Sequence, residues 1–321
     1  MARPERLLPA DLDVRSYLLE LPAPRRKRAV EALGPDNWDS FDAAWPHWAH
    51  DGQLAPPPLA DGTPWSTWVI KAGRGFGKTR AGAEWIAALV AAPENGGSAV
   101  ALSIALVGAS LEDARKVMIE GRSGLVEVAA AEIADWEPCR GRLTFRSGAQ
   151  AQLFSGASPD LLRGPEHHYA WCDELAKWDK PQETWDMLQL GLRLGANPQA
   201  VVTTTPRSGS VLRAIMADPA TQVTGGPTRA NPHLPRAWKQ RVSRLYAGTR
   251  LGRQELDGEL LPDAAGALWT VELLERCPSP SLCDGADFWR HFSISSTVHS
   301  APAASGSSSP SSSWRPRRVP A

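Results

Sequence analysis

Cysteine is scarce in this sequence, with four residues in a chain of 321. So few cysteines argue against a disulfide-stabilised scaffold, and no two of them have the CxxC spacing typical of a zinc site. The chain also lacks an apolar run near the ~20 residues of a membrane-spanning helix, and its charged N-terminal segment contains no signal-peptide pattern. We therefore expect a soluble, cytoplasmic protein that has no membrane partner.

Lysine is rare as well, since seven lysines accompany 28 arginines. This excess of arginine is typical of a GC-rich genome, although arginine also favours bidentate contacts with phosphate and carboxylate groups. Basic and acidic residues balance at 35 each, so the net charge does not indicate a nucleic-acid-binding protein, while local basic patches remain possible. Apolar residues make up 42% of the chain, which is enough for a sizeable core, and the length allows about two domains.

Acidic residues are missing beyond Asp287, and eleven of the last 31 residues are serine. Such a segment cannot bury enough apolar surface to fold, so we expect residues 288–321 to be a disordered tail rich in serine, proline and arginine. Residues 263–287 are interpreted as a linker or as the remnant of the start of a further domain. At the other end, the helical spacing of apolar residues and a run of tryptophans predict a helical N-terminal arm over residues 1–60.

Residues 61–262 alternate between β-rich runs and helical stretches, which is the pattern of βαβ units and a mostly parallel sheet. The expected strands are Thr67–Lys71, Ser103–Gly108, Leu143–Phe145, Gln150–Phe154, His168–Cys172 and Ala200–Thr205. The expected helices are Thr79–Ala91, Leu111–Glu120, Pro181–Leu194 and Ser210–Ala217, with a further small helical region near residues 230–262. The prediction is therefore an α/β domain built on a mostly parallel sheet.

The glycine-rich segment between the first expected strand and helix fits the phosphate-loop pattern, with alanine at the first glycine position. Its small residues let backbone N–H groups surround phosphate oxygens at a helix N-terminus, where the helix dipole favours anions. Lys78 is expected to reach the β- and γ-phosphates of a nucleotide, and the hydroxyl of Thr79 to bind Mg²⁺. The predicted nucleotide-binding residues are Ala72, Gly73, Arg74, Gly75, Phe76, Gly77, Lys78 and Thr79.

Two carboxylates follow the apolar run that ends at Cys172. Asp173 is expected to hold Mg²⁺, through water, and Glu174 to orient and polarise the attacking water. An Asp-Glu pair at this position favours ATP hydrolysis of the motor or helicase type, and solvated loop charge is the alternative reading. ATP and Mg²⁺ are therefore the expected cofactors.

A hydroxyl cluster ends the last expected strand and is a candidate for sensing the γ-phosphate and coupling it to moving parts, although threonine favours strands in any case. Its residues are Thr203, Thr204 and Thr205. Two arginines are further catalytic candidates. Arg74 lies inside the phosphate loop and can approach the phosphates, whereas Arg163 can reach the nucleotide of a neighbouring subunit or clamp its own loop. His167 and His168 lack a suitably spaced third ligand, so they are interpreted as loop residues and not as metal ligands.

The phosphate loop, together with the segment 80–85 that follows it, resembles the large terminase subunit of tailed phages and of phage-like gene transfer agents. The segments 171–178, 203–206 and 254–259 match that family in the same order, and the resemblance covers roughly residues 35–275. It implies a three-layer phosphate-loop ATPase of the ASCE type, a motor that pumps double-stranded DNA into a prohead. It also implies as partners a portal protein, a small terminase subunit and further copies of the chain in a ring, in which Arg163 matches an arginine acting in trans.

That family normally continues into a nuclease that holds two metal ions with several carboxylates. No β-run ending in an aspartate follows Trp269 here, so we expect no nuclease metal site. The tail resembles a reading frame translated out of phase, and a genuine short form is the alternative.

Two other functions remain open beside the motor. One is a non-hydrolysing assembly or adaptor module that docks on the portal and the small terminase. The other is a helicase-like translocase unrelated to packaging. The intact Lys78, Asp173 and Glu174 argue against the first, and the lack of further helicase motifs beyond residue 206 argues against the second.

Overall fold

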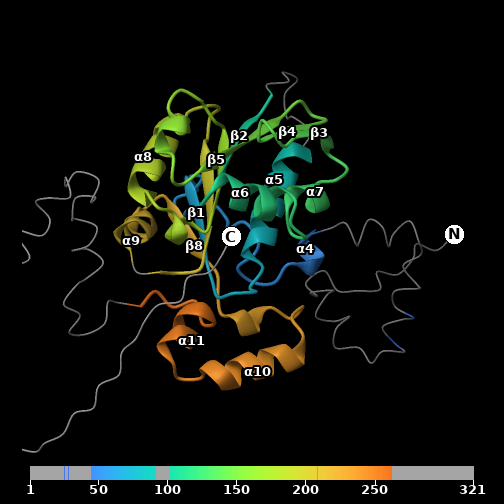
Figure 1. Ribbon diagram of the computed structural model, residues 1–321, viewed down its shortest axis with the longest axis vertical. Helices are drawn as coiled ribbons and strands as arrows, with labels where there is room; N and C mark the ends of the chain where they lie inside the picture. Colours follow the sequence, from blue (N-terminus) through green and yellow to red (C-terminus); the bar gives the residue numbers. More distant parts are fainter. Residues whose placement is uncertain (1–24, 26–27, 29–44, 92–100, 208, 262–321) are drawn as a thin grey trace, which may run out of the picture. The chain divides into compact units, whose positions relative to one another are not determined.

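The computed structural model describes residues 25, 28, 45–91, 101–207 and 209–261 (Figure 1). Apart from residues 25 and 28, the expected N-terminal arm lies outside the described residues up to position 44, and so do the expected linker (263–287) and tail (288–321). Within the described residues, the helices are α4 (Trp45–Trp48), α5 (Lys78–Ala91), α6 (Leu111–Asp113), η1 (Ala114–Ile119), α7 (Leu125–Val128), η2 (Pro159–Leu162), η3 (Leu175–Lys177), α8 (Pro181–Gly191), α9 (Ser210–Ala217), η4 (Thr228–Ala230), α10 (Arg236–Tyr246) and α11 (Arg250–Glu255). The strands are β1 (Thr67–Lys71), β2 (Ser103–Gly108), β3 (Ile133–Glu137), β4 (Arg142–Phe145), β5 (Gln150–Ser155), β6 (Tyr169–Asp173), β7 (Gln199–Thr204) and β8 (Thr221–Thr224).

These strands form one sheet of eight in the order β3-β4-β5-β2-β6-β7-β1-β8. In this order, the six strands β5, β2, β6, β7, β1 and β8 pair in parallel. Strands β4 and β3 add an antiparallel edge next to β5. The prediction of a mostly parallel α/β sheet is therefore confirmed. β7 lies between β1 and β6, so the strand before the phosphate loop does not pair with the strand that carries the two carboxylates.

Successive residues of the central strands point to opposite faces of the sheet and enter two separate cores. Trp68 of β1, Leu106 of β2 and Trp171 of β6 belong to the core that α5, η1 and α7 cover. Their neighbours Val69 and Cys172 belong to the core that η2, α8 and α9 cover. The sheet is thus buried on both faces, as expected for parallel strands, and the domain has the three layers that the family resemblance implied.

The sequence pattern missed two edge strands. β3 has no fully buried side chain, so it shows no apolar signal, and β8 is only four residues long, with Val223 exposed. The expected helix over 111–120 is instead a short α-turn followed by a π-helix. Nothing in the apolar spacing distinguishes a π-helix from an α-helix over a single turn.

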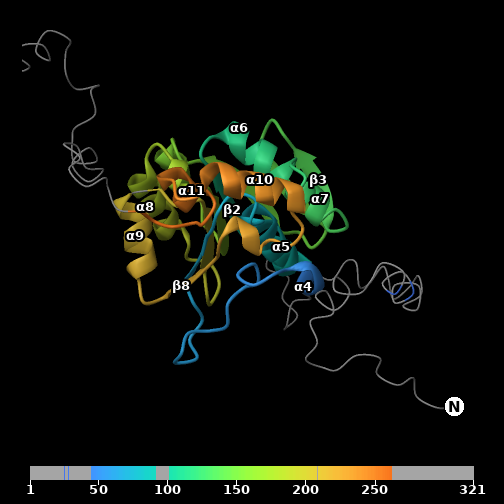
Figure 2. The same ribbon diagram turned by 90° about the horizontal axis from the view of Figure 1, so that it is seen from below.

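The small helical region expected near residues 230–262 contains α10 and α11, which lie against each other at one end of the domain (Figure 2). Backbone contacts tie this region to the phosphate loop. Arg74 N donates to Glu255 O at 2.7 Å, and Gly73 N donates at 3.0 Å to Gly226 O, in the segment between β8 and this region. None of the helices in the described part of the chain is both long and apolar enough to cross a membrane.

Close packing of α5 on β6 depends on Gly82. A Cβ atom on this residue would lie 2.4 Å from Cε2 of the Trp171 indole, which is fully buried beneath the helix. Trp171 is fixed in turn, because its Nε1 donates to Thr203 Oγ1 of the neighbouring strand at 3.0 Å. The glycine therefore sets the distance between the helix that follows the phosphate loop and the strand that carries the carboxylates.

We expect Gly82→Ala to destabilise the protein by about 1–3 kcal/mol, because the added methyl overpacks a site with no room to relax. The result is diagnostic, since alanine is the better helix former by about 1 kcal/mol and would otherwise stabilise α5. Urea unfolding of both proteins measures the difference. A stabilised variant would show that α5 can shift away from Trp171 without cost.

Candidate active site

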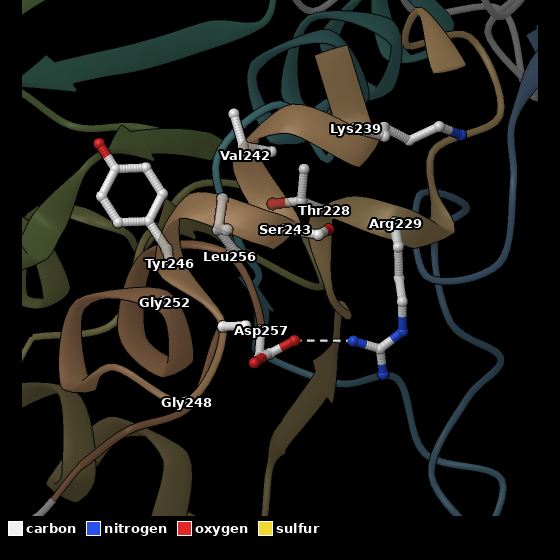
Figure 3. Close-up of a pocket in the computed structure, with 11 residues that line it drawn as sticks. Thr228, Arg229, Lys239, Val242, Ser243, Tyr246, Gly248, Gly252, Leu256 and Asp257 are labelled. Atoms are coloured by element: carbon white, nitrogen blue, oxygen red, sulfur yellow. Dashed lines mark hydrogen bonds and ion pairs between the residues drawn. The ribbon is translucent and has the colours of Figure 1, made fainter. Parts of the chain in front are cut away.

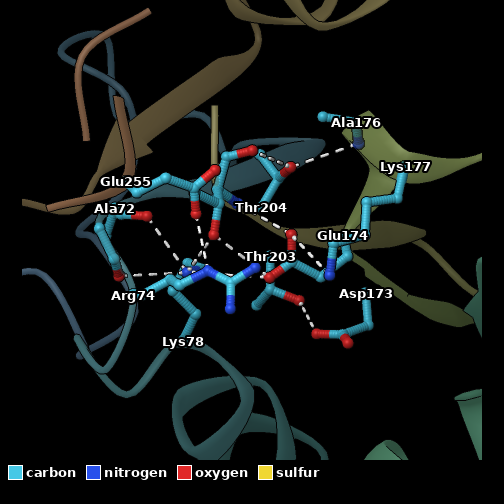
Figure 4. Close-up of polar contacts among 12 residues, drawn as sticks. Ala72, Arg74, Lys78, Asp173, Glu174, Ala176, Lys177, Thr203, Thr204 and Glu255 are labelled. Carbon is cyan, nitrogen blue, oxygen red and sulfur yellow. Dashed lines mark hydrogen bonds and ion pairs between the residues drawn. The ribbon is translucent and has the colours of Figure 1, made fainter. Parts of the chain in front are cut away.

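Three parallel strands end side by side and bring the predicted site residues together. β1 leads into the phosphate loop, β6 ends at Asp173, and β7 ends at Thr204, with Asp173 in register with Thr203. The carboxyl ends of parallel strands lie at one edge of a sheet, which is the usual place of a ligand site in such folds. Figure 4 shows the resulting polar cluster.

The phosphate loop turns through two residues with left-handed backbone angles. Gly75 has φ of 73° and Gly77 has φ of 98°, a region that glycine enters without steric cost. α5 begins immediately afterwards at Lys78. Since the first N–H groups of a helix have no partner within it, the loop and the helix together present donors suited to an anion. Thr79 lies in that first turn and is half-buried.

Lys78 is the centre of the cluster. Its side chain is only 7% exposed, and Nζ donates to Ala72 O at 3.1 Å, Gly73 O at 3.3 Å and Thr205 Oγ1 at 3.0 Å. Glu174 Oε1 lies 4.0 Å away. Burial lowers the pKa of the ammonium, while the nearby carboxylates of Glu174 and Asp173 raise it. The three protein oxygens replace the water that burial removes from this cation.

The carboxylate of Glu174 is held by Thr205, the residue directly after the neighbouring strand β7. Its backbone has φ of 49°, in the left-handed region that non-glycine residues rarely enter. Its carboxylate accepts hydrogen bonds from Thr205 N at 3.1 Å and Thr205 Oγ1 at 3.3 Å. Because Thr205 Oγ1 also accepts from Lys78, one hydroxyl links the lysine to the glutamate. Backbone strain at an aimed polar side chain is a feature of functional sites.

Asp173 is buried beside this chain of contacts. Burial raises its pKa to about 6, although the hydrogen bond from Thr203 Oγ1 at 2.7 Å opposes the shift. A buried carboxylate supported by a single side-chain hydroxyl is a site where a cation would be stabilised. Among the described residues, no group of three or more His, Cys, Asp or Glu side chains forms a metal-binding cluster, so any cation here would need further oxygens from a ligand or water.

The three threonines expected to couple the site have distinct contacts. Thr203 Oγ1 accepts from Trp171 Nε1 and donates to Asp173, and Thr205 joins Lys78 to Glu174. Thr204 Oγ1 accepts from Ala176 N in η3, directly after the carboxylate pair. Thr203 of β7 and Thr205 directly after this strand therefore contact Asp173, Lys78 and Glu174.

Two predicted catalytic arginines have ion partners of their own, and neither side chain contacts Lys78, Asp173 or Glu174 among the described residues. Arg74 Nε donates to Glu255 Oε2 at 2.7 Å, and its side chain is 65% exposed. Arg163 pairs with Asp160 of its own loop at 2.9 Å and is 68% exposed. No contact in the described part of the chain joins Arg163 to Lys78 or Glu174.

Four side chains that brace the phosphate loop gave no signal in the sequence. They donate to loop carbonyls: His50 to Phe76 O at 2.8 Å, Gln53 to Gly77 O at 3.1 Å, Thr228 to Arg74 O at 2.7 Å, and Asn231 to Gly75 O at 2.6 Å. Their acceptors are backbone groups distant in sequence, so no residue pattern records the pairing. Gln53, Asn231 and Arg80 also line a cavity of about 420 Å³ beside the loop.

The two histidines interpreted as loop residues anchor the start of β2. Ser103 N donates to His168 Nδ1 at 3.0 Å, and Ser103 Oγ lies 3.1 Å from His167 Nδ1. Burial lowers the pKa of His167 to about 4, so its ring is neutral at pH 7. The other ring nitrogen of His167, Nε2, is buried and has no hydrogen-bond partner among the described residues.

Thr203 offers a test of this network. Thr203→Val keeps the side-chain shape but leaves the buried Trp171 Nε1 and the Asp173 carboxylate without their partner. We expect a loss of about 2–3 kcal/mol in the free energy of unfolding, measured with urea at pH 7. Thr221→Val is the matched control, since the buried Thr221 Oγ1 has no hydrogen-bond partner among the described residues. It should be neutral within about 0.5 kcal/mol or stabilising. Equal losses in the two variants would contradict the role assigned to the Thr203 hydroxyl.

Comparison with solved structures shows the same fold in phage packaging proteins. The ATPase domain of the Thermus phage P74-26 large terminase has a TM-score of 0.52 and 16% identity, over 71% of this chain and 98% of that one. The large terminase from a thermophilic bacteriophage has a TM-score of 0.50 and 13% identity, over 63% of this chain and 51% of that one. The same thermophilic-phage terminase in complex with ADP has a TM-score of 0.50 and 14% identity, over the same shares of the two chains.

The alignment with the thermophilic-phage protein spans about half the length of that terminase. No curated protein sequence matches the chain. The family described as terminase large subunit, T4likevirus-type, N-terminal, matches residues 69–276, which is well over half of the sequence. The matched region contains the phosphate loop, the Asp-Glu pair and the threonine cluster. The chain belongs to the family of phage terminase large subunits.

Proposed function

We propose that this chain is the ATP-hydrolysing motor module of a DNA-packaging terminase and drives double-stranded DNA into a prohead. The observation that carries the proposal is the continuous polar chain from Lys78 through Thr205 to Glu174 at the end of the parallel sheet. It joins a phosphate-binding cation to an acceptor for a water proton. Membership of the terminase family, and the ADP complex of the thermophilic-phage relative, support the same function.

The residues from Ala72 to Thr79 would surround the β- and γ-phosphates of ATP. Lys78 then exchanges carbonyl and hydroxyl acceptors for phosphate oxygens, so the buried ammonium keeps its hydrogen bonds when nucleotide arrives. The exchange releases Thr205 Oγ1 from the lysine. Nucleotide binding would therefore change the hydrogen bonding of Thr205 directly after β7. Through Thr205 it would also change the contacts of Glu174.

Thr79 and Asp173 would hold Mg²⁺, whose preferred ligands are hydroxyl, carboxylate and water oxygens. The buried Asp173 fits this role, because a nearby cation favours its ionised form over the neutral form that burial favours. The metal supplies positive charge to the phosphate oxygens. Thr203 positions the Asp173 oxygen by a hydrogen bond at 2.7 Å.

Glu174 would orient the attacking water and accept its proton. Two donors from Thr205 fix the carboxylate, so its direction is set by β7 and not by solvent. Thr204 adds a contact to η3, which begins directly after the same glutamate. Movement of β7 therefore changes the position of the catalytic base, and this is the coupling role proposed for the three threonines.

Arg74 would approach the phosphates after leaving Glu255. In the structure its guanidinium and its backbone N–H both bond to Glu255 at the end of α11. A nucleotide that draws Arg74 inward removes the side-chain contact and loosens α11 from the phosphate loop. The proposed partners are double-stranded DNA, the portal protein, the small terminase subunit and further copies of the chain in a ring.

Substitutions of Lys78 and Glu174 should separate binding from turnover. Lys78→Ala should weaken nucleotide binding and hydrolysis together, because the lysine contacts ground-state phosphates. Glu174→Gln should bind ATP nearly as well as the wild type and lose at least about 10²-fold in turnover. Nucleotide affinity and steady-state ATPase rates of both variants are the measurements. Absence of ATP binding by the wild type would favour the non-hydrolysing adaptor, and equal loss of binding in both variants would refute the role of Glu174.

Arg163 is proposed to act on the nucleotide of a neighbouring subunit. Its loop is exposed, and its own ion partner Asp160 is 85% exposed, so the pair costs little to open. Arg163→Ala and Glu174→Gln chains should each be inactive in a ring, whereas a mixture should regain part of the ATPase activity, because a mixed ring contains complete sites. Ring formation is verified first by sedimentation. A mixture as inactive as its components would place Arg163 in its own subunit's site or in a structural role.

A further inference from the structure

Helix α10 has one strongly basic face. No acidic residue occurs between Asp218 and Glu255, a stretch that contains the whole of α10 and seven lysine and arginine residues. At 3.6 residues per turn, Arg236, Arg244 and Arg241 fall within an arc of about 140° around the helix axis. All three side chains are exposed.

The opposite side of α10 is turned toward the rest of the protein. Val242, Tyr246 and Lys239 line a cavity of about 230 Å³ together with residues of η4 and α11 (Figure 3). Trp238 and Val242 line a second cavity of about 350 Å³ with Arg74 and Glu255. Lys239 is directed inward, since its Nζ donates to Asn231 O at 3.0 Å. The three outward arginines therefore play no part in attaching the helix.

These three arginines also have no carboxylate partner among the described residues. Nine arginines elsewhere in that part of the chain form ion pairs with Asp or Glu: Arg74, Arg80, Arg115, Arg140, Arg142, Arg163, Arg193, Arg229 and Arg253. Three adjacent cations without a counter-charge repel each other and produce a local positive potential, although the chain as a whole is neutral.

We propose that the basic face formed by Arg236, Arg241 and Arg244 binds the phosphate backbone of double-stranded DNA. The inference rests on the proposed packaging function and names the surface by which the chain grips its substrate. Arg236 and Arg244 are eight residues apart, or about 12 Å along the axis, and phosphates of one strand recur every ~3.4 Å along a duplex. The face therefore spans about three to four nucleotides of one strand.

Its contacts are suited to sequence-independent binding. Guanidinium groups neutralise phosphates without reading base edges, as a motor that moves along any DNA requires. The same helix shares a cavity with Arg74 and Glu255, so a nucleotide that separates this ion pair changes the packing beneath α10. The helix that carries the proposed DNA-binding face is thus linked to the phosphate loop through one shared cavity.

The test compares two doubly substituted full-length chains with the same change in charge. R241Q/R244Q alters the basic face, and R122Q/R213Q removes two other exposed arginines that have no ion pair among the described residues. Glutamine preserves helix propensity. Affinity for a short duplex of mixed sequence is measured by fluorescence anisotropy from low salt, about 50 mM, to about 300 mM, and ATP affinity is measured in parallel.

For R241Q/R244Q we expect at least about tenfold weaker DNA binding at low salt and a salt slope smaller by about 1.8, since each lost phosphate contact removes ~0.9. The control pair should bind DNA like the wild type, and R241K/R244K should retain the salt slope. ATP affinity should be unchanged in all of them, which separates this inference from the proposed nucleotide chemistry.

Three results would overturn the proposal. They are wild-type affinity in R241Q/R244Q, an equal loss in the control pair, and absence of duplex binding by the wild type at low salt. Retained DNA binding with lost self-association would instead assign the face to a neighbouring subunit. ATP binding that persists in any of these cases would leave the nucleotide site of the proposed function standing.

Discussion

The site depends on the hydrogen bonds that the buried ammonium of Lys78 donates to protein oxygens. A cation that is 7% exposed must be surrounded by oxygens, and the phosphate loop supplies two of them from its own carbonyls. The third comes from Thr205, the residue directly after β7. The need to satisfy this charge therefore ties the curvature of the loop to the end of β7, and β7 in turn fixes Glu174. In the proposed function, nucleotide phosphates would replace these oxygens, because they accept hydrogen bonds from the same ammonium.

Strand order makes this arrangement possible. Since β7 lies between β1 and β6, the threonine cluster separates the phosphate loop from the carboxylates and contacts both. Had β1 and β6 been neighbours, the lysine and the glutamate would meet without an intermediary. The indole of Trp171 beneath Gly82 keeps α5 at the right distance, so packing in one core supports hydrogen bonding at the edge of the sheet.

The local parts of this site follow from sequence, and the long-range contacts do not. Alternating apolar runs predict the central strands, and small residues between a strand and a helix predict the phosphate loop. The pair Asp173 and Glu174 is evident in the sequence because the two carboxylates directly follow an apolar run. Arg74 shows the limit, because its pairing with Glu255 joins residues 181 positions apart and no spacing rule encodes it. The hydrogen bonds from His50 and Gln53 to carbonyls of the phosphate loop cannot be read from the sequence either, because they join distant residues. The edge strand β3 has no fully buried side chain, so its sequence shows no alternation of apolar and polar residues.

The helical region after β8 has two kinds of contact with the phosphate loop, and they differ in strength. Its backbone bonds to Gly73 and Arg74 and the bond from Thr228 involve main-chain groups, whereas the Arg74–Glu255 pair joins a largely exposed guanidinium to a partly buried carboxylate. Exposed ion pairs contribute little to stability and are easily exchanged. In the proposed function, nucleotide phosphates would compete for Arg74, so the ion pair is the contact that binding would break while the backbone bonds keep the region attached. A region held in this way would be able to change its angle without leaving the domain, and α10, which lines a cavity together with the same ion pair, would follow.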